Sequence, residues 1–265
     1  MASNGETPPS PVVELASVYK SFGDFKVLDG VDLEIYPRET LVIIGQSGTG
    51  KSVTLRHIVG LLAPDSGTVK VFGRDLSTLT DTELKEFRLR IGYLFQSGAL
   101  INWMRIEDNV ALPLQERHPK LPAAEIRQRV LEKLRLVNME TALEKFPAEI
   151  SGGMKKRGGL ARAIILDPEI ILYDEPTSGL DPVIAATVDE LVNHTRDTLG
   201  VTQVVVTHDM ESAYRIADRI AMLYQGKIIA LGTPEEIRSN SNPLVQQFIT
   251  GSSKGPMTKG STDQT

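Results

Sequence analysis

The chain has 265 residues and a net charge of −5, and 41% of its residues are hydrophobic and 24% charged. This length suits one large α/β domain or two small ones with a buried core, and the composition is ordinary for a globular protein. The negative charge gives no support to a nucleic-acid partner, and the absence of cysteine excludes disulfides, thiolate chemistry and cysteine-bearing zinc sites.

The two ends of the sequence are predicted to be disordered tails. Residues 1–11 and 251–265 are polar, contain Ser, Gly and Pro, and have few apolar side chains. Segments of this kind cannot bury enough surface to offset the entropy that is lost on ordering. Residues 1–11 have no basic region followed by an apolar stretch, so we expect no secretory signal and a cytoplasmic location.

Between the tails, short apolar segments rich in β-branched residues alternate with helical patterns, which indicates βαβ units and a mainly parallel sheet. A Gly-rich loop separates a strand at 40–44 from a helix predicted over 52–62, which residues 63–67 should stop. From about 106 to 166 the pattern is helical, notably at 123–136, and no strand is convincing. The other strands are predicted at 12–18, 27–35, 68–72, 91–95, 170–173, 203–206 and 220–224.

A phosphate-binding loop is predicted after the strand at 40–44. The residues Gly45-Gln46-Ser47-Gly48-Thr49-Gly50-Lys51-Ser52 match the pattern G-x-x-x-x-G-K-[ST] between a strand and a helix. Glycines let the backbone N–H groups curl around phosphate oxygens, and the following helix end adds partial positive charge. Lys51 should reach the β- and γ-phosphates, and the Ser52 hydroxyl should ligate Mg²⁺. The alternative is an ordinary Gly-rich turn, which the strand–loop–helix context disfavours.

Two carboxylates, Asp174 and Glu175, follow the apolar strand at 170–173. Ligand sites of parallel sheets lie beyond the carboxyl ends of the strands, so this pair can meet the phosphate loop. Asp174 fits the carboxylate linked to Mg²⁺, and Glu175 is then placed to polarise a water in line with the γ-phosphate. A solvated pair at a strand end is the alternative. A lone histidine is usually structural, but His208 follows the strand at 203–206 and should lie at the same sheet edge.

The order and spacing of five features resemble the ABC transporter ATPase family over about residues 12–250. The features are the phosphate loop, Gln96, Ser151-Gly152-Gly153, Asp174-Glu175 followed by Ser178-Gly179-Leu180-Asp181, and His208. The resemblance implies an α/β P-loop NTPase with a RecA-like, mainly parallel sheet, an antiparallel β subdomain, and an inserted helical signature subdomain at about 97–166. It also implies ATP hydrolysis with Mg²⁺.

The resemblance further implies roles for individual residues. Glu175 would be the catalytic glutamate, His208 the switch histidine on the γ-phosphate, and Gln96 the glutamine that touches Mg²⁺ and the attacking water and couples to the permease. Phe22 lies where the family has an aromatic residue stacked on adenine, with Tyr19 as a nearby competitor. Besides Phe22, Gln96 and residues 45–52, the nucleotide-binding residues implied are Thr54, Ser151, Gly152, Gly153, Asp174 and Asp181, and Ser52, Gln96 and Asp174 would hold the metal.

The residues Ile150-Ser151-Gly152-Gly153-Met154 resemble the family signature, usually written Leu-Ser-Gly-Gly-Gln. Ser151 is an N-cap candidate for a helix running towards Leu166, so this helix end offers a second anion site. In this family the two anion sites lie far apart on one chain, which implies a head-to-tail homodimer enclosing two ATP molecules. An ordinary loop is the alternative for Ser-Gly-Gly alone.

Two features depart from the usual signature segment. Met154 replaces the glutamine, which removes one polar contact near the nucleotide of the partner. Gly158 and Gly159 each cost about 1 kcal/mol relative to alanine inside a helix, which predicts close packing at that point. Neither feature removes a phosphate ligand or the base, so we still expect an active site.

Phe95-Gln96-Ser97-Gly98-Ala99-Leu100 and Ser151-Gly152-Gly153-Met154-Lys155-Lys156-Arg157 resemble the Mla/Mce-type subfamily, which moves phospholipids or other lipids between membranes. This implies a permease in the inner membrane with the chain peripheral on its cytoplasmic face, an Mce-domain lipid-binding protein and other accessory subunits. The sequence itself has no apolar run near the roughly 20 residues of a transmembrane helix. The alternative is the ATPase of an importer for a small polar solute such as an amino acid.

An apolar stretch after Gln96 could belong to the core or to a groove for a permease helix. It comprises Ala99, Leu100, Ile101, Trp103 and Met104, and it includes the only tryptophan of the chain. We place Trp103 in the groove.

Two other classes of protein fit less well. Non-transport ABC proteins carry a long coiled coil or two cassettes in tandem, and this sequence has neither. A regulatory module that binds ATP without hydrolysing it does not need a complete set of catalytic groups. Here Lys51, Glu175 and His208 are all present, and with them Asp174.

Overall fold

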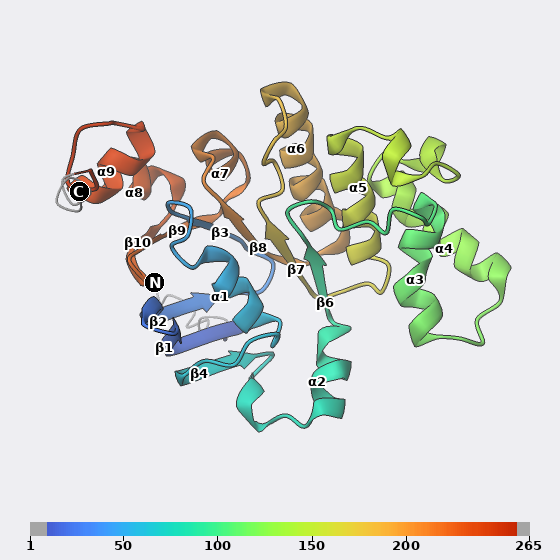
Figure 1. Ribbon diagram of the computed structural model, residues 1–265, viewed down its shortest axis with the longest axis horizontal. Helices are drawn as coiled ribbons and strands as arrows, with labels where there is room; N and C mark the ends of the chain where they lie inside the picture. Colours follow the sequence, from blue (N-terminus) through green and yellow to red (C-terminus); the bar gives the residue numbers. More distant parts are fainter. Residues whose placement is uncertain (1–9, 259–265) are drawn as a thin grey trace, which may run out of the picture.

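The computed structural model describes residues 10–258, which form two sheets and the helices packed around them (Figure 1). The strands are β1 Val13–Phe22, β2 Phe25–Ile35, β3 Thr40–Ile44, β4 Ser66–Val71, β5 Arg74–Asp75, β6 Ile91–Leu94, β7 Ile170–Asp174, β8 Thr202–Thr207, β9 Arg219–Tyr224 and β10 Lys227–Gly232. The α-helices are α1 Lys51–Ile58, α2 Asp81–Arg88, α3 Ile106–Arg117, α4 Ala123–Leu136, α5 Gly152–Ala163, α6 Pro182–Leu199, α7 Met210–Ile216, α8 Pro234–Arg238 and α9 Pro243–Thr250. Short 3₁₀ turns lie at Leu76–Thr78, Glu140–Ala142 and Pro147–Glu149.

The larger sheet has the strand order β10-β9-β3-β8-β7-β6. All of its neighbouring pairs are parallel except β9 with β10, so the mainly parallel sheet predicted from the sequence is confirmed. The smaller sheet, β2-β1-β4-β5, is antiparallel throughout. The fold is therefore the α/β arrangement with an added antiparallel sheet that the family resemblance implies.

Side chains of the central strands alternate between two cores. On β3, Leu41 and Ile43 face the core shared with α1 and the antiparallel sheet, whereas Val42 and Ile44 face the core shared with α3 to α7. This period of two is the pleat of a strand that is buried on both faces. It explains why the parallel strands read as continuous apolar runs.

The helices α3, α4 and α5 gather at one end of the molecule, and α8 and α9 lie at the opposite end (Figure 1). No strand interrupts the described chain between β6 and β7, as the sequence indicates. Within residues 10–258, no helix is both long and apolar enough to cross a membrane.

Three predictions from the sequence need correction. The strand predicted at 12–18 continues to Phe22 in β1, past an irregularity at Ser17, which has a φ of +46°. The helix expected over 52–62 ends at Ile58, because Gly60 adopts a φ of +67° and the chain turns there. Strand β10 was not predicted, because its hairpin turn at Gln225-Gly226 uses a non-Gly residue at positive φ and lacks an Asn-Gly or Asp-Gly signal.

The segment that follows α9 lies against it. The backbone N–H of Met257 donates to the side-chain oxygen of Gln247 at 2.8 Å, and the Met257 side chain packs on the core. Of the two tails expected at 1–11 and 251–265, residues 1–9 and 259–265 lie outside the described residues.

The close packing expected at Gly158 and Gly159 is present where α5 meets the loop after β6. A Cβ added to Gly159 would lie 2.7 Å from the carbonyl oxygen of Gly98 and 3.0 Å from its Cα. A Cβ added to Gly158 would meet only side-chain atoms at ordinary contact distances, with Leu100 Cδ1 at 3.4 Å and two Ile106 carbons at 3.9 Å. Of the two positions, only 159 therefore requires glycine to avoid a steric clash.

We expect Gly159→Ala to destabilise the fold by about 1–3 kcal/mol, because the methyl group has to push backbone aside. Gly158→Ala is the matched control on the same helix turn, and it should be neutral or gain up to about 1 kcal/mol of helix propensity. Chemical denaturation of both variants measures the two changes in unfolding free energy. Equal effects at the two positions would contradict the close approach of α5 to Gly98.

Candidate functional site

Three neighbouring parallel strands end at one edge of the central sheet and carry the predicted site residues. In the register, Ile44 of β3 lies beside Thr207 of β8, and Asp174 of β7 lies beside Val206. The phosphate loop, Glu175 and the residues after β8 therefore follow strand ends that are already aligned. This is the edge at which parallel sheets bind ligands.

The phosphate loop, residues 45–50, connects β3 directly to α1. Gly45 has a φ of 153°, and an added Cβ would lie 2.3 Å from the carbonyl oxygen of Leu223, so only glycine fits there. Gly50 is the N-cap of α1 and has no side chain to accept from the first N–H groups of that helix. These N–H groups and the helix dipole are left for an anion.

The Lys51 side chain bends back over the phosphate loop. Its ammonium donates to the carbonyl oxygens of Gly45 and Gln46 at 2.8 and 3.0 Å and lies 3.8 Å from Glu175 Oε1. Only 6% of the residue is exposed, and this burial lowers the pKa of Lys51 from its ordinary value. The loop thus holds a desolvated cation beside its N–H groups, ready for phosphate oxygens.

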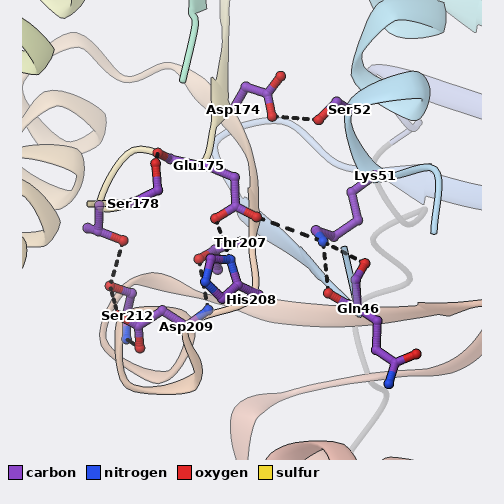
Figure 2. A network of polar contacts seen from close by, with 12 residues as sticks. Gln46, Lys51, Ser52, Asp174, Glu175, Ser178, Thr207, His208, Asp209 and Ser212 are labelled. Atoms are coloured by element: carbon purple, nitrogen blue, oxygen red, sulfur yellow. Dashed lines mark hydrogen bonds and ion pairs between the residues drawn. The ribbon is translucent and has the colours of Figure 1, made fainter. Parts of the chain in front are cut away.

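Ser52, Asp174 and Tyr93 form a short hydrogen-bonded chain, part of which Figure 2 shows. The Ser52 hydroxyl donates to Asp174 Oδ1 at 2.7 Å, and the Tyr93 hydroxyl donates to Asp174 Oδ2 at 3.2 Å. Burial and the neighbouring carboxylate raise the pKa of Tyr93, so the phenol keeps its proton. Both oxygens of Asp174 are therefore held in place.

Glu175 lies between Lys51 and His208 (Figure 2). Its Oε2 is 2.9 Å from His208 Nδ1, and its backbone N–H donates to the carbonyl oxygen of Val206. Glu175 also has a φ of +52°, which is unusual for a residue with a Cβ and is maintained by the surrounding contacts. The carboxylate points into the space between the phosphate loop and His208.

A cleft of about 370 Å³ opens beside the phosphate loop, a size that suits a small-molecule ligand. It is lined by Phe22, Val27, Ser47, Gly48, Gly50, Lys51, Ser52, Val53, Gln96 and Glu175. Phe22 is half-exposed there, whereas its competitor Tyr19 packs over Gly30 of β2. The cleft therefore unites the phosphate loop with an aromatic ring and the glutamine after β6.

Several predicted site residues lie elsewhere in the described chain. Thr54 is buried one turn inside α1 and donates to the Gly50 carbonyl oxygen. Asp181 caps α6 by accepting from the N–H groups of Val183 and Ile184. Neither residue lines the cleft beside the phosphate loop.

The signature residues form the start of α5. Ser151 is the N-cap and accepts from the Met154 N–H, which confirms the predicted cap. Gly153 packs against Ile184 of α6, and Ser151 and Gly152 are exposed. None of the signature residues lines the cleft of the same chain.

Two residues beside the site were not predicted. Tyr93 bonds to Asp174, and Lys156 of α5 donates to the carbonyl oxygen of Glu175. A polar side chain inside the apolar strand β6 is a signal that would have led to Tyr93. The sequence around Lys156 points the wrong way, because a run such as Lys155-Lys156-Arg157 is typical of a solvated helix face and Lys156 is buried.

A larger hollow of about 530 Å³ lies beside β4 and α2. Its arginines already face carboxylates, in the pairs Arg74 with Glu83, Arg117 with Glu86, and Arg90 with Glu169. An anion would have to displace these partners, so we centre the functional site on the cleft at the phosphate loop.

A family model described as ABC transporter matches residues 28–178. The chain is 42% identical over 257 residues to the probable ribonucleotide transport ATP-binding protein mkl of Mycobacterium leprae, which covers 97% of this chain and 74% of the relative. The chain belongs to the ABC transporter family. It is an ATP-binding subunit of an ABC transporter, and it hydrolyses ATP.

Other members of the ABC transporter family give matches of similar extent. The chain is 38% identical over 246 residues to the intermembrane phospholipid transport system ATP-binding protein MlaF of Escherichia coli, covering 93% of this chain and 91% of MlaF. The dimeric structure of MJ0796, a bacterial ABC transporter cassette, has a TM-score of 0.77 and 34% identity, covering 84% of this chain and 98% of the cassette.

We expect Phe22→Ala to weaken ATP binding by at least about 5-fold, since stacking of an aromatic ring on a base contributes about 1–3 kcal/mol. Tyr19→Ala is the matched control, because it removes a nearby aromatic residue that packs on β2, and it should change the affinity by less than about 2-fold. Titration with a fluorescent ATP analogue measures both. Greater loss in Tyr19→Ala would assign the stacking residue to Tyr19.

Proposed function

We propose that this ABC transporter subunit powers the movement of phospholipid between two membranes. The observation that supports this is the match to MlaF, which spans nearly the full length of both chains and includes the phosphate-loop, signature and His208 regions. The mycobacterial relative named for ribonucleotide transport is slightly more similar but is covered over 74% of its length. Ribonucleotide transport is therefore the second candidate.

For ATP hydrolysis, we assign the chemistry to the side chains at the sheet edge. Lys51 and the N–H groups of the phosphate loop hold the β- and γ-phosphates, and Phe22 stacks on the adenine. Glu175 accepts a proton from the water that attacks the γ-phosphate, and its carboxylate is already oriented by His208 at 2.9 Å. His208 and Gln96 contact the γ-phosphate and the water as ATP closes the site.

Magnesium fits the oxygen donors beside the phosphate loop. Ser52 and Asp174 would hold it, with Gln96 as a further ligand. No group of three or more His, Cys, Asp or Glu residues among the described residues could hold a metal ion by itself. The Ser52 hydroxyl and Asp174 Oδ1, 2.7 Å apart, suit Mg²⁺, which proteins bind through one or two carboxylates together with the phosphate oxygens of the substrate. The ion would neutralise charge that develops on the phosphates.

The active form in this proposal is a head-to-tail homodimer. Each chain supplies the phosphate loop for one ATP molecule and the exposed start of α5, Ser151 to Gly153, for the ATP molecule held by the other chain. The dimeric state of the related cassette MJ0796 and the 73% exposure of Val183 beside Asp181 support this arrangement.

The proposed permease contact lies in the stretch after Gln96. Trp103 is 83% exposed, so the possibility that it belongs to the core is ruled out. A large exposed aromatic residue at a surface turn suits a partner groove. Through this contact the subunit would lie on the cytoplasmic face of the inner membrane, with an Mce-domain protein and other accessory subunits completing the system.

We expect Glu175→Gln to lower ATP turnover by at least about 10²-fold, the usual scale for loss of a positioned base. ATP binding should persist, so an ATP-bound dimer should accumulate in gel filtration. Glu211→Gln, which neutralises an exposed carboxylate on α7, is the control and should keep normal turnover. Unchanged turnover in Glu175→Gln would refute the assignment of the base.

The transported substrate is tested on the native membrane complex. We expect mass spectrometry of the purified complex to find bound phospholipid, and phospholipid in proteoliposomes to stimulate the ATPase. Ribonucleotides added on either side should not stimulate it, and an amino-acid mixture serves as the control for a small polar solute. Stimulation by a ribonucleotide or amino acid, with no effect of phospholipid, would contradict the proposal.

A further inference from the structure

Lys156 is a buried cation directly behind Glu175. It belongs to α5, and only 5% of it is exposed. Its ammonium donates to the backbone carbonyl oxygen of Glu175 at 2.8 Å and to Ser178 Oγ at 3.2 Å. Both acceptors are neutral, and no carboxylate oxygen of the described residues lies within ion-pair distance of this ammonium. A buried charge without a direct counterion is costly, so its position calls for an explanation.

The carbonyl group of Glu175 is the point on which several donors converge. Besides Lys156, the hydroxyl of Ser178 donates to this oxygen at 3.0 Å and the backbone N–H of Ser178 donates to it at 3.3 Å. Glu175 is held at a φ of +52°, a strained conformation for a residue with a Cβ. These three donors stabilise the peptide orientation that sends the carboxylate towards Lys51 and His208.

Lys156 also connects two parts of the ATPase that are separate in the sequence. It lies about one and a half turns after Ser151 on the same helix. In the proposed function, the start of α5 contacts the nucleotide held by the partner chain, whereas Glu175 acts on the nucleotide held by its own chain. A displacement of α5 would therefore act on the Glu175 backbone directly, through the Lys156 side chain.

We infer that Lys156 is a positioning residue that holds the backbone of Glu175 in its own chain and links the catalytic carboxylate to the signature helix. The inference rests on the proposed function, because it requires the dimer in which α5 meets the nucleotide of the partner. Lys156 touches neither the substrate nor the attacking water. Its effect should therefore fall on kcat and leave the binding of ATP intact.

The first test compares Lys156→Met with Lys156→Gln in the native complex. The two side chains are similar in length and neutral, but only glutamine keeps an N–H donor for the Glu175 carbonyl. We expect Lys156→Met to lower kcat by at least about 10-fold with KM for ATP changed by less than about 2-fold, and Lys156→Gln to restore kcat by at least about 3-fold over Lys156→Met. Lys155→Met, which removes a half-buried charge one residue away, is the control and should keep normal kcat.

A measurement other than turnover distinguishes a positioning role of Lys156 from general damage to the fold. In the Glu175→Gln background, ATP should still drive Lys156→Met into a stable dimer at the same ATP concentration. Equal kcat for Lys156→Met and the wild type, or for Lys156→Met and Lys156→Gln, would overturn the inference. If Lys156→Met does not fold, Ser178→Ala tests the inference instead. Loss of this second side-chain donor to the Glu175 carbonyl should lower kcat by about 3-fold or more at unchanged KM, and an unchanged kcat would overturn the inference.

Mixed dimers then determine on which chain Lys156 acts. In one dimer, the chain with Lys156→Met keeps Glu175 and its partner carries Glu175→Gln. In the other, Lys156→Met and Glu175→Gln are on the same chain and the partner is wild type. Each dimer has one working carboxylate, and the reference dimer has Glu175→Gln on one chain only.

We expect the first mixed dimer to be impaired like the double Lys156→Met dimer, and the second to match the reference. Impairment of the second alone would mean that Lys156 acts on the nucleotide of the partner, which would overturn the inference. An active wild-type complex with unaffected Lys156 variants would overturn this inference alone. An inactive wild-type complex would overturn the proposed function as well.

Discussion

The parallel register of β3, β8 and β7 is the constraint on which the site depends. Ile44 lies beside Thr207, and Asp174 lies beside Val206, so three loops leave the sheet at one edge. The bulky apolar side chains on both faces of these strands fix that register, because a slip by one residue would exchange the two cores. The hydrophobic core thereby places polar groups that have no packing role of their own.

At this sheet edge, two positive and two negative side chains lie close together. Two lysines, Lys51 and Lys156, are buried close to Asp174 and Glu175, and burial lowers the pKa of each lysine while the carboxylates oppose the shift. Each ammonium donates its hydrogen bonds to backbone carbonyl oxygens or a hydroxyl, and Lys51 adds a longer ion pair of 3.8 Å to Glu175 Oε1. Glu175 Oε2 is occupied by His208, but no side chain of residues 10–258 donates a hydrogen bond to Oε1, so this oxygen can accept one from water.

The sequence predicts the parts of this protein that depend on local pattern. The phosphate loop could be placed to the residue, because its glycines and Lys51 act through neighbouring backbone, and the parallel strands could be placed because they are continuous apolar runs. Lys156 could not be found, because its burial depends on how α5 packs against the turn after β7. The end of α1 and the strand β10 were missed because both depend on positive φ angles, at Gly60 and Gln225. Local composition does not predict these angles.

The packing of α5 also explains how a permease signal could reach the carboxylate. Gly98 lies so close to α5 that an added Cβ on either Gly98 or Gly159 would clash with backbone, and Arg162 of α5 donates to the carbonyl oxygens of Gly98 and Ala99. The loop after Gln96 and the signature helix are thus held as one unit. A movement at the exposed Trp103 turn would shift α5, and with it the Lys156 ammonium on the Glu175 carbonyl. Because the contacts at Gly98 are between backbones, they transmit displacement with little compliance. The contacts of α5 therefore join the surface proposed for the permease to the residue proposed as the base.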